Sequence, residues 1–250
     1  MLRPNMPENE LLSVRFLLGL IVVLLGLLAI AFVALIALVT GLPVTMLVGQ
    51  ALDALFATSS VQALWYVTRA AGLVAYLLLW LATAWGLAVS SKIFEPMLQG
   101  AFTYDFHQFL SLFAIGFVVL HVVVLVADRY LPFSIAAVLI PFVAPYRPVW
   151  VGIGVIGLYL TLLVTVTFYI RRWIGKKAFR MIHMASLVAY VAAAVHGLMA
   201  GTDSPLWTAQ VMYAGTMLVI VFLMVYWLAM LLPNKRSPST TKPTGQLDRA

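Results

Sequence analysis

Long apolar runs separated by short polar segments dominate the chain. Six of the runs are long enough to cross a membrane as helices, and they cover residues 16–40, 64–89, 106–127, 150–170, 179–200 and 206–232. A further apolar stretch at 131–148 is interrupted by four prolines, so it is expected to be re-entrant or interfacial. The pattern predicts an all-α fold, an integral membrane bundle of six helices.

The two ends of the chain are polar. Residues 1–15 form a short N-terminal segment, and the run at 16–40 is too long for a signal-peptide core and lacks a convincing cleavage site. We therefore interpret 16–40 as an uncleaved first transmembrane helix. Residues 233–250 are rich in proline, serine and threonine, so we expect a disordered tail that is too short for a flavin or nicotinamide domain.

Composition supports the membrane assignment and limits the chemistry. Hydrophobic residues make up 64% of the chain and charged residues 9%, too little polar surface to cover a water-soluble fold, so the lipid bilayer is the expected surrounding. The chain has no cysteine, which excludes disulfides, iron–sulfur clusters and covalently attached haem. The formal charge of +7 comes largely from basic residues that flank apolar runs, so no nucleic-acid partner is expected.

The distribution of basic residues predicts the orientation. Many of them lie in the segment between the fourth and fifth runs, which we expect to be a loop, namely Arg171, Arg172, Lys176, Lys177 and Arg180. Others lie before the first run and after the sixth, whereas the opposite loops hold few. By the positive-inside rule, both termini should be cytoplasmic in a multi-pass protein of the plasma membrane.

All four histidines of the chain lie in two of the apolar runs. His107 and His121 are 14 residues apart in the third run, and His183 and His196 are 13 apart in the fifth. Both runs cross in the same direction, so His107 should face His183 near the cytoplasmic side and His121 should face His196 near the outer side. Neutral imidazoles are good axial ligands for haem iron, and facing helices of a bundle can hold a macrocycle between them. The pattern favours two stacked b-type haems between helices three and five over hydrogen-bonding, proton-relay or haem-free transport roles.

One interval conflicts with ideal helix geometry. Fourteen residues return to within about 40° of the starting face, whereas thirteen end about 140° away. His183 and His196 would then not share a face, and no proline or glycine lies between them. We expect either a distorted fifth helix or laterally offset haems.

Several stretches resemble the ferric reductase-like transmembrane domain shared by ferric reductases, NADPH oxidases and the haem-binding membrane subunit of periplasmic methionine sulfoxide reductase systems. These stretches are TRAAGLVAYLLLW, FHQFLSLFAIGFVVLH, FYIRRWIG and IHMASLVAYVAAAVHGLMAGTDS. The resemblance covers a five-helix core at 64–232 and implies electron transfer across the membrane through two haems. This chain lacks the flavin and nicotinamide domain often attached to the family, so the resemblance implies a separate donor, a flavoprotein or a quinol, and an acceptor on the outer face.

Whether such a chain is itself an enzyme stays open, because no nucleophile or acid–base group is apparent. It is expected to be an oxidoreductase membrane subunit. A quinol-linked di-haem cytochrome b subunit and a haem-free, histidine-dependent transporter remain as alternative functions.

Arg69 resembles the arginine that oxidases of this family carry near the outer haem. It would bind a haem propionate, since a charge inside a span usually has a partner. Arg129 and Arg147 could serve the same propionates or anchor the chain at the headgroups.

Glycines form two further patterns. Gly152, Gly154 and Gly157 spell G-x-G-x-x-G, but within a helix, so close helix packing is expected rather than dinucleotide binding. Gly197 and Gly201 could admit haem or a neighbouring helix.

Overall fold

The computed structural model describes residues 63–93 and 100–231, and α-helix is the regular secondary structure over that part of the chain. Its helices are α3 (Ala63–Ser90), α4 (Gly100–Ala127), α5 (Ile135–Leu139), α6 (Pro148–Tyr169), α7 (Arg171–His183), α8 (Ala185–Ala200) and α9 (Trp207–Leu231). The all-α prediction is confirmed for these residues. The predicted segments at 1–15, 16–40 and 233–250 lie outside the described residues.

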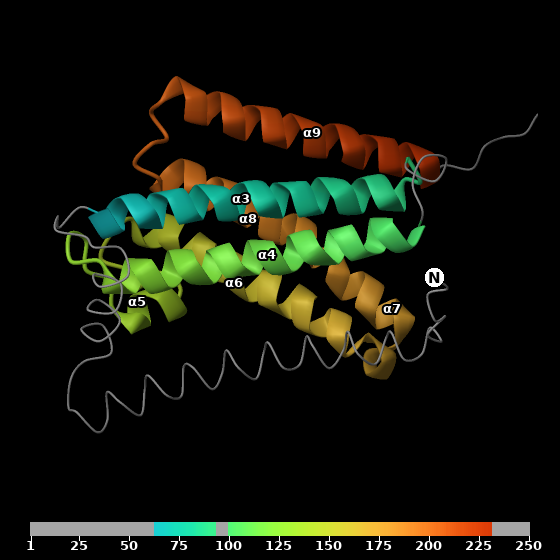
Figure 1. Cartoon of the computed structure of the whole chain (residues 1–250), viewed down its shortest axis with the longest axis horizontal. Helices are drawn as coiled ribbons and strands as arrows, with labels where there is room; N and C mark the ends of the chain where they lie inside the picture. Colours follow the sequence, from blue (N-terminus) through green and yellow to red (C-terminus); the bar gives the residue numbers. More distant parts are fainter. Residues whose placement is uncertain (1–62, 94–99, 232–250) are drawn as a thin grey trace, which may run out of the picture.

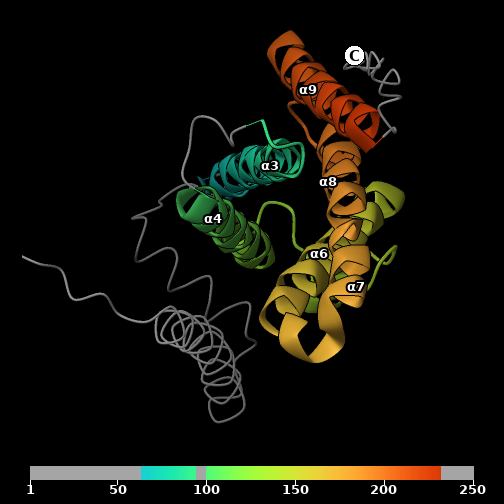
Figure 2. The same cartoon turned by 90° about the vertical axis from the view of Figure 1, so that its right-hand side faces the viewer.

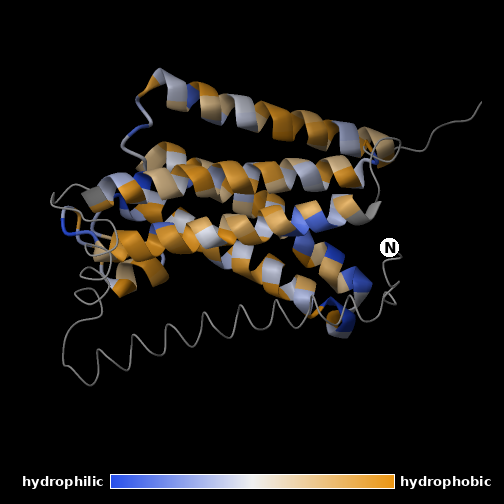
Figure 3. Cartoon of the chain, viewed as in Figure 1, coloured by the Kyte–Doolittle hydropathy of each residue, from blue (hydrophilic) through white to orange (hydrophobic). Residues whose placement is uncertain are grey.

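Among the described residues, five helical spans are long and apolar enough to cross a membrane. They are Leu64–Ser90, Phe102–Ala127, Pro148–Tyr169, Arg171–Ala200 and Trp207–Leu231, and the fourth combines α7 with α8. In Figure 3, hydrophobic colour runs along these helices and hydrophilic colour gathers toward their ends, most clearly at α7. Length and composition therefore indicate a multi-pass membrane protein.

The spans form two packed pairs that face each other. α3 packs along α4, and α6 packs along α8, while α9 lies against α3 on the far side (Figure 1). Seen along the bundle, α3 and α4 lie on one side and α6, α7 and α8 on the other (Figure 2). Residues that point between the two pairs can thus meet across the centre of the bundle.

The proline-interrupted stretch forms the short helix α5 between α4 and α6 and no spanning helix. Ser134 caps α5 by accepting the Ala137 N–H at 3.1 Å. Phe133 and Val138 are buried in an apolar cluster that includes Val151 of α6. At five residues, α5 is far too short to cross a membrane, and it lies at one end of the bundle (Figure 1).

The basic segment between the fourth and fifth spans is helical, not a loop as the sequence suggested. Ile170 alone separates α6 from α7, and Gly175 interrupts α7 with φ 80° and ψ 159°. Because glycine adopts positive φ readily, the chain changes direction there without a long connection. Lys176, Lys177 and Arg180 then project as exposed residues from the second half of α7.

The fifth span is distorted directly after His183, within the 13-residue interval that ends at His196. Met184 separates α7 from α8, with φ −61° and ψ −22°, and the Leu187 N–H bonds the Met184 carbonyl three residues back at 3.2 Å. A turn of three residues advances about 20° more per residue than an α-helical turn. This tightening rotates His183 toward the face of His196, so of the two alternatives the structure shows a distorted fifth helix.

Candidate functional site

The structure brings the four histidines together in the two predicted pairs. The ring centroids of His107 and His183 are 6.1 Å apart, and those of His121 and His196 are 6.4 Å apart. The ring planes within each pair are inclined at 73° and 77°. α4 supplies one histidine to each pair, α7 ends at His183, and α8 supplies His196.

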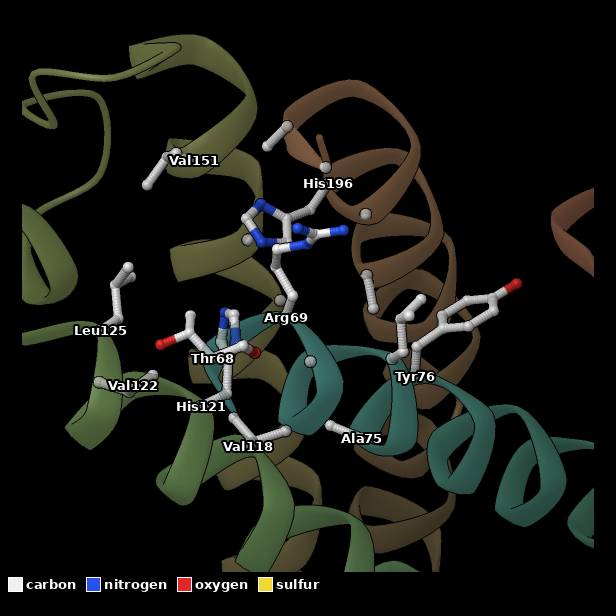
Figure 4. A pocket seen from close by; sticks show the side chains of 18 of the residues that line it. Thr68, Arg69, Ala75, Tyr76, Val118, His121, Val122, Leu125, Val151 and His196 are labelled. Carbon is white, nitrogen blue, oxygen red and sulfur yellow. The ribbon is translucent and has the colours of Figure 1, made fainter. Parts of the chain in front are cut away.

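Each pair lines a cavity between the two helix pairs. The His121–His196 cavity has a volume of about 220 Å³ and receives mostly apolar side chains from α3, α4, α6 and α8 (Figure 4). The His107–His183 cavity measures about 110 Å³. Leu79 and Thr161 line both, so the two cavities are stacked along the bundle.

Backbone carbonyls orient both imidazoles of the His121–His196 pair. Nδ1 of His121 lies 2.8 Å from the Thr68 carbonyl oxygen, and Nδ1 of His196 lies 2.9 Å from the Trp150 carbonyl oxygen. A carbonyl only accepts hydrogen bonds, so both Nδ1 atoms carry the proton. The Nε2 atoms are then left with free lone pairs, the state in which an imidazole binds a metal.

The His107–His183 pair is held less firmly. The imidazole of His107 interacts with the backbone carbonyl of Ala82, four residues before Gly86, but its Nδ1 makes no hydrogen bond of full geometry. Nδ1 of His183 is buried and has no hydrogen-bond partner within the described part of the chain. The two pairs therefore share a spacing and differ most in how His183 is held.

Glycines on the neighbouring helices let three of the imidazoles approach closely. A Cβ built on Gly72 would lie 2.9 Å from the His121 ring, one on Gly86 3.1 Å from the His107 ring, and one on Gly154 2.5 Å from the His196 ring. Any side chain at these positions would press on an imidazole. The carbonyls that His121 and His196 bond belong to Thr68 and Trp150. These residues lie four positions before Gly72 and Gly154, respectively.

The spacing of two glycines in the sequence indicates these contacts, which the histidine spacing alone does not reveal. Gly72 and Gly86 are 14 residues apart, the same interval that separates His107 from His121. Fourteen residues are close to four helical turns, so each set stays on one face of its helix. A matching interval on an adjacent antiparallel helix is therefore a usable sign of a pair of imidazole contacts.

Arg69 lines the His121–His196 cavity and is paired with Asp203. Its Nε donates to Oδ2 of Asp203 at 2.8 Å, and its Nη2 donates to Oδ1, so the ion pair is bidentate. The side chains are 30% and 23% exposed. Asp203, which sequence reasoning did not select, also lines the cavity, so a carboxylate from the α8–α9 connection already partners the arginine.

The other two candidate arginines lie away from the histidines. Arg147 donates to the Met199 carbonyl at 2.5 Å and lies over the Tyr146 ring, while Arg129 is exposed just after α4. Neither lines either cavity. Of the three arginines, the geometry favours Arg69 as a contact for a molecule bound between His121 and His196.

The glycines of the G-x-G-x-x-G pattern serve different contacts. A Cβ on Gly157 would lie 3.3 Å from the Cβ of Ala192, so this glycine admits α8 close to α6, as expected from helix packing. Gly154 admits the imidazole of His196 instead. Gly197, next to His196, faces the hydroxyl of Tyr213 on α9, so it admits a neighbouring helix.

Asp128 lies just beyond α4, outside the spanning segment, and is 3% exposed. Its Oδ1 accepts the Tyr130 N–H at 3.1 Å, whereas Oδ2 has no hydrogen-bond partner among the residues described. Burial raises the pKa of this carboxyl, against the opposing effect of the backbone N–H groups of 129–131. Asp128 lines neither cavity, so we leave it outside the candidate site.

The spacing of each histidine pair suits one metal ion bound from opposite sides. An imidazole nitrogen binds a transition metal at about 2 Å, and the ring centre lies about 1.2 Å behind it, so opposed imidazoles have ring centres roughly 6.4 Å apart. Within the described ranges, no group of three or more His, Cys, Asp or Glu side chains is arranged to hold a metal ion. Two protein ligands are the number that a haem iron accepts at its axial positions.

Comparison of the chain with known protein families, with curated proteins and with solved structures found no match in any of the three. The resemblance to the ferric reductase-like domain therefore stays a prediction from its motifs.

Proposed function

We propose that this chain is a membrane electron-transfer subunit that holds two b-type haems, one between His107 and His183 and one between His121 and His196. The observation that carries the proposal is the meeting of four imidazoles, from widely separated parts of the sequence, in two pairs whose ring centres are 6.1 and 6.4 Å apart. Two cavities stacked between the same helices support it.

The residues of the chain suit the binding and shielding of such a group. The Thr68 and Trp150 carbonyls fix the protonated nitrogens of His121 and His196 and leave Nε2 available as the ligand. Apolar side chains such as Leu73, Val118 and Val155 line the cavity and exclude water. A bound haem supplies reversible one-electron chemistry, which no side chain of the site provides by itself.

Arg69 would hold a carboxylate of the bound group at the mouth of the same cavity. Its guanidinium already makes a bidentate contact with Asp203 and so has the geometry that carboxylates prefer. A propionate would share the arginine with Asp203 or displace it.

The charge distribution supports an orientation for the transfer. The basic residues of α7 lie at the end of the bundle that holds His183, and the positive-inside rule favours the cytoplasmic side for them. The His107–His183 site would then accept electrons from a cytoplasmic flavoprotein or a membrane quinol. The His121–His196 site would deliver them to an acceptor outside the plasma membrane, with both termini of the chain cytoplasmic.

Haem content tests the proposal. We expect the purified full-length chain to show a reduced-minus-oxidised spectrum of b-type haem and two haems per chain by pyridine haemochrome. His121→Ala and His107→Ala should each retain one haem, because each variant removes one axial ligand from one pair. A correctly folded wild-type protein without haem would exclude the proposal, and one haem per chain would exclude only its two-haem form.

A further inference from the structure

The two histidine sites differ in the hydrogen bonds that orient their imidazoles. In the His121–His196 site, both imidazoles donate a hydrogen bond through Nδ1 to a backbone carbonyl, at 2.8 and 2.9 Å. In the His107–His183 site, His107 has only a weaker interaction with the Ala82 carbonyl, and Nδ1 of His183 is buried without a hydrogen-bond partner among the described residues. Three of the four imidazoles are therefore held against a carbonyl, and His183 is not.

Contacts with glycine reinforce the difference. Both imidazoles of the His121–His196 site lie against a glycine, Gly72 or Gly154, which blocks rotation of the ring toward that helix. His107 has the corresponding contact with Gly86. None of the described glycines has the His183 ring among its nearest neighbours, so His183 lacks both the carbonyl and the glycine. It also lies directly before the distortion at Met184, where the helix is interrupted.

The hydroxyls around the His107–His183 site do not replace the missing bonds. Several line the cavity, and the hydroxyls of Thr83, Ser111 and Thr165 each donate to a carbonyl four residues back in their own helix. None of these hydroxyls bonds Nδ1 of either imidazole. The ring of His183 is thus the one of the four whose orientation no hydrogen bond to the described residues fixes.

Orientation of a ligand histidine through its second nitrogen affects affinity strongly. Loss of such an outer hydrogen bond typically weakens metal binding by about 10- to 100-fold. Resting on the proposed function, we propose that the His121–His196 site binds haem first and at least about 10-fold more tightly than the His107–His183 site. Assembly of the electron path is then sequential, and occupancy of the His107–His183 site determines when the path is complete.

A haem titration of the full-length apoprotein, produced in haem-limited cells and kept in detergent, tests this order. We expect two phases in the Soret absorbance, each of one haem per chain, with dissociation constants that differ by at least about 10-fold. Haem transfer to an excess of a haem-scavenging globin gives a second readout. The haem that binds in the tighter phase should be the last to leave the chain.

Variants assign the phases. His121→Ala should remove the tight phase and keep the weak one, whereas His107→Ala should do the opposite; His121→Gln and His107→Gln give size-conserving substitutes if an alanine variant fails to fold. Gly72→Ala should weaken the tight phase by moving the His121 ring off the Thr68 carbonyl. Gly116→Ala is the matched control, because a Cβ at Gly116 meets no atom within 4 Å.

The outcomes separate this inference from the function on which it rests. Two phases of equal affinity, or a tight phase that disappears in His107→Ala and survives in His121→Ala, would overturn the inference and leave the proposed function standing. A folded wild-type chain that takes up no haem in either phase would overturn both.

Discussion

Three glycines, and the backbone carbonyls four residues before each of them, determine how three of the imidazoles lie against the neighbouring helices. Gly72 and Gly154 each leave room for a ring that donates to the carbonyl four residues earlier. The positions of the four histidines were predictable from spacing and topology. The carbonyl bonds were not, because every helix residue has a carbonyl and only packing determines which one an imidazole reaches.

The contact between Gly154 and His196 gives a prediction at this scale. In Gly154→Ala, the added methyl would lie 2.5 Å from Nδ1 of His196, so the ring must move and its bond to the Trp150 carbonyl should be lost. We expect the haem affinity of the His121–His196 site to fall by about 10-fold or more, as measured by Soret titration. Gly215→Ala, where a Cβ would meet nothing within 4 Å, should bind as the wild type does. Equal affinities for both variants would show that the close contact is unimportant.

The ion pair of Arg69 with Asp203 gives a second residue-level prediction. If Arg69 holds a propionate, Arg69→Gln should weaken the binding of haem but leave the binding of haem dimethyl ester, which has no carboxylate, nearly unchanged. Titrations with the two compounds measure the difference. Asp203→Asn is the matched control. It should still bind haem more tightly than haem dimethyl ester, as the wild type does, because the arginine remains. A wild-type chain that binds both compounds equally would rule out a propionate contact.

At the scale of the helices, α9 illustrates how an apolar helix is attached within a membrane. Tyr76 of α3 bonds Thr216 of α9 at 2.5 Å and Tyr190 of α8 at 3.2 Å, and the Trp80 indole donates to the Thr216 carbonyl at 3.1 Å. The three side chains Tyr76, Tyr190 and Tyr213 are buried at 5%, 0% and 8% exposure. Because lipid offers no hydrophobic drive for association, these polar contacts attach α9 to the bundle.

Removal of the Thr216 hydroxyl should therefore loosen α9. Thr216→Val keeps the shape of the side chain but leaves the Tyr76 hydroxyl without one partner. We expect a loss of about 0.6 to 1.7 kcal/mol in the free energy of unfolding, measured in mixed detergent micelles. Thr216→Ser retains the hydroxyl and should lose less. A valine variant as stable as the wild type would show that packing alone holds α9.

Hydropathy predicted the helices better than their connections. The predicted runs 64–89, 150–170 and 206–232 differ from α3, α6 and α9 by at most two residues at either end. α4 begins at Gly100, six residues before the predicted start, because its first turns carry polar residues that a hydropathy pattern omits. The basic segment was wrongly predicted as a loop, since charge indicates the membrane boundary and not the local backbone conformation.

For the molecule as a whole, the two helix pairs arrange the histidines at two depths of one bundle. The 14-residue interval on α4 corresponds to about 21 Å of rise, so two stacked sites can extend across much of a hydrocarbon core. The topology of the apolar runs predicted this stacking. The 13-residue interval predicted a distorted helix as one of two alternatives, but not its position at Met184. The inequality of the sites was not predictable, since it depends on contacts between helices.

Electron transfer across a membrane tests the central claim most directly. Vesicles that contain the haem-loaded chain and trapped ferricyanide would be mixed with external dithionite, and ferricyanide loss followed by absorbance. We predict rapid reduction with the wild type, and rates near those of protein-free vesicles with His107→Ala or His121→Ala. Haem-loaded wild-type vesicles that reduce ferricyanide no faster than protein-free vesicles would contradict the account.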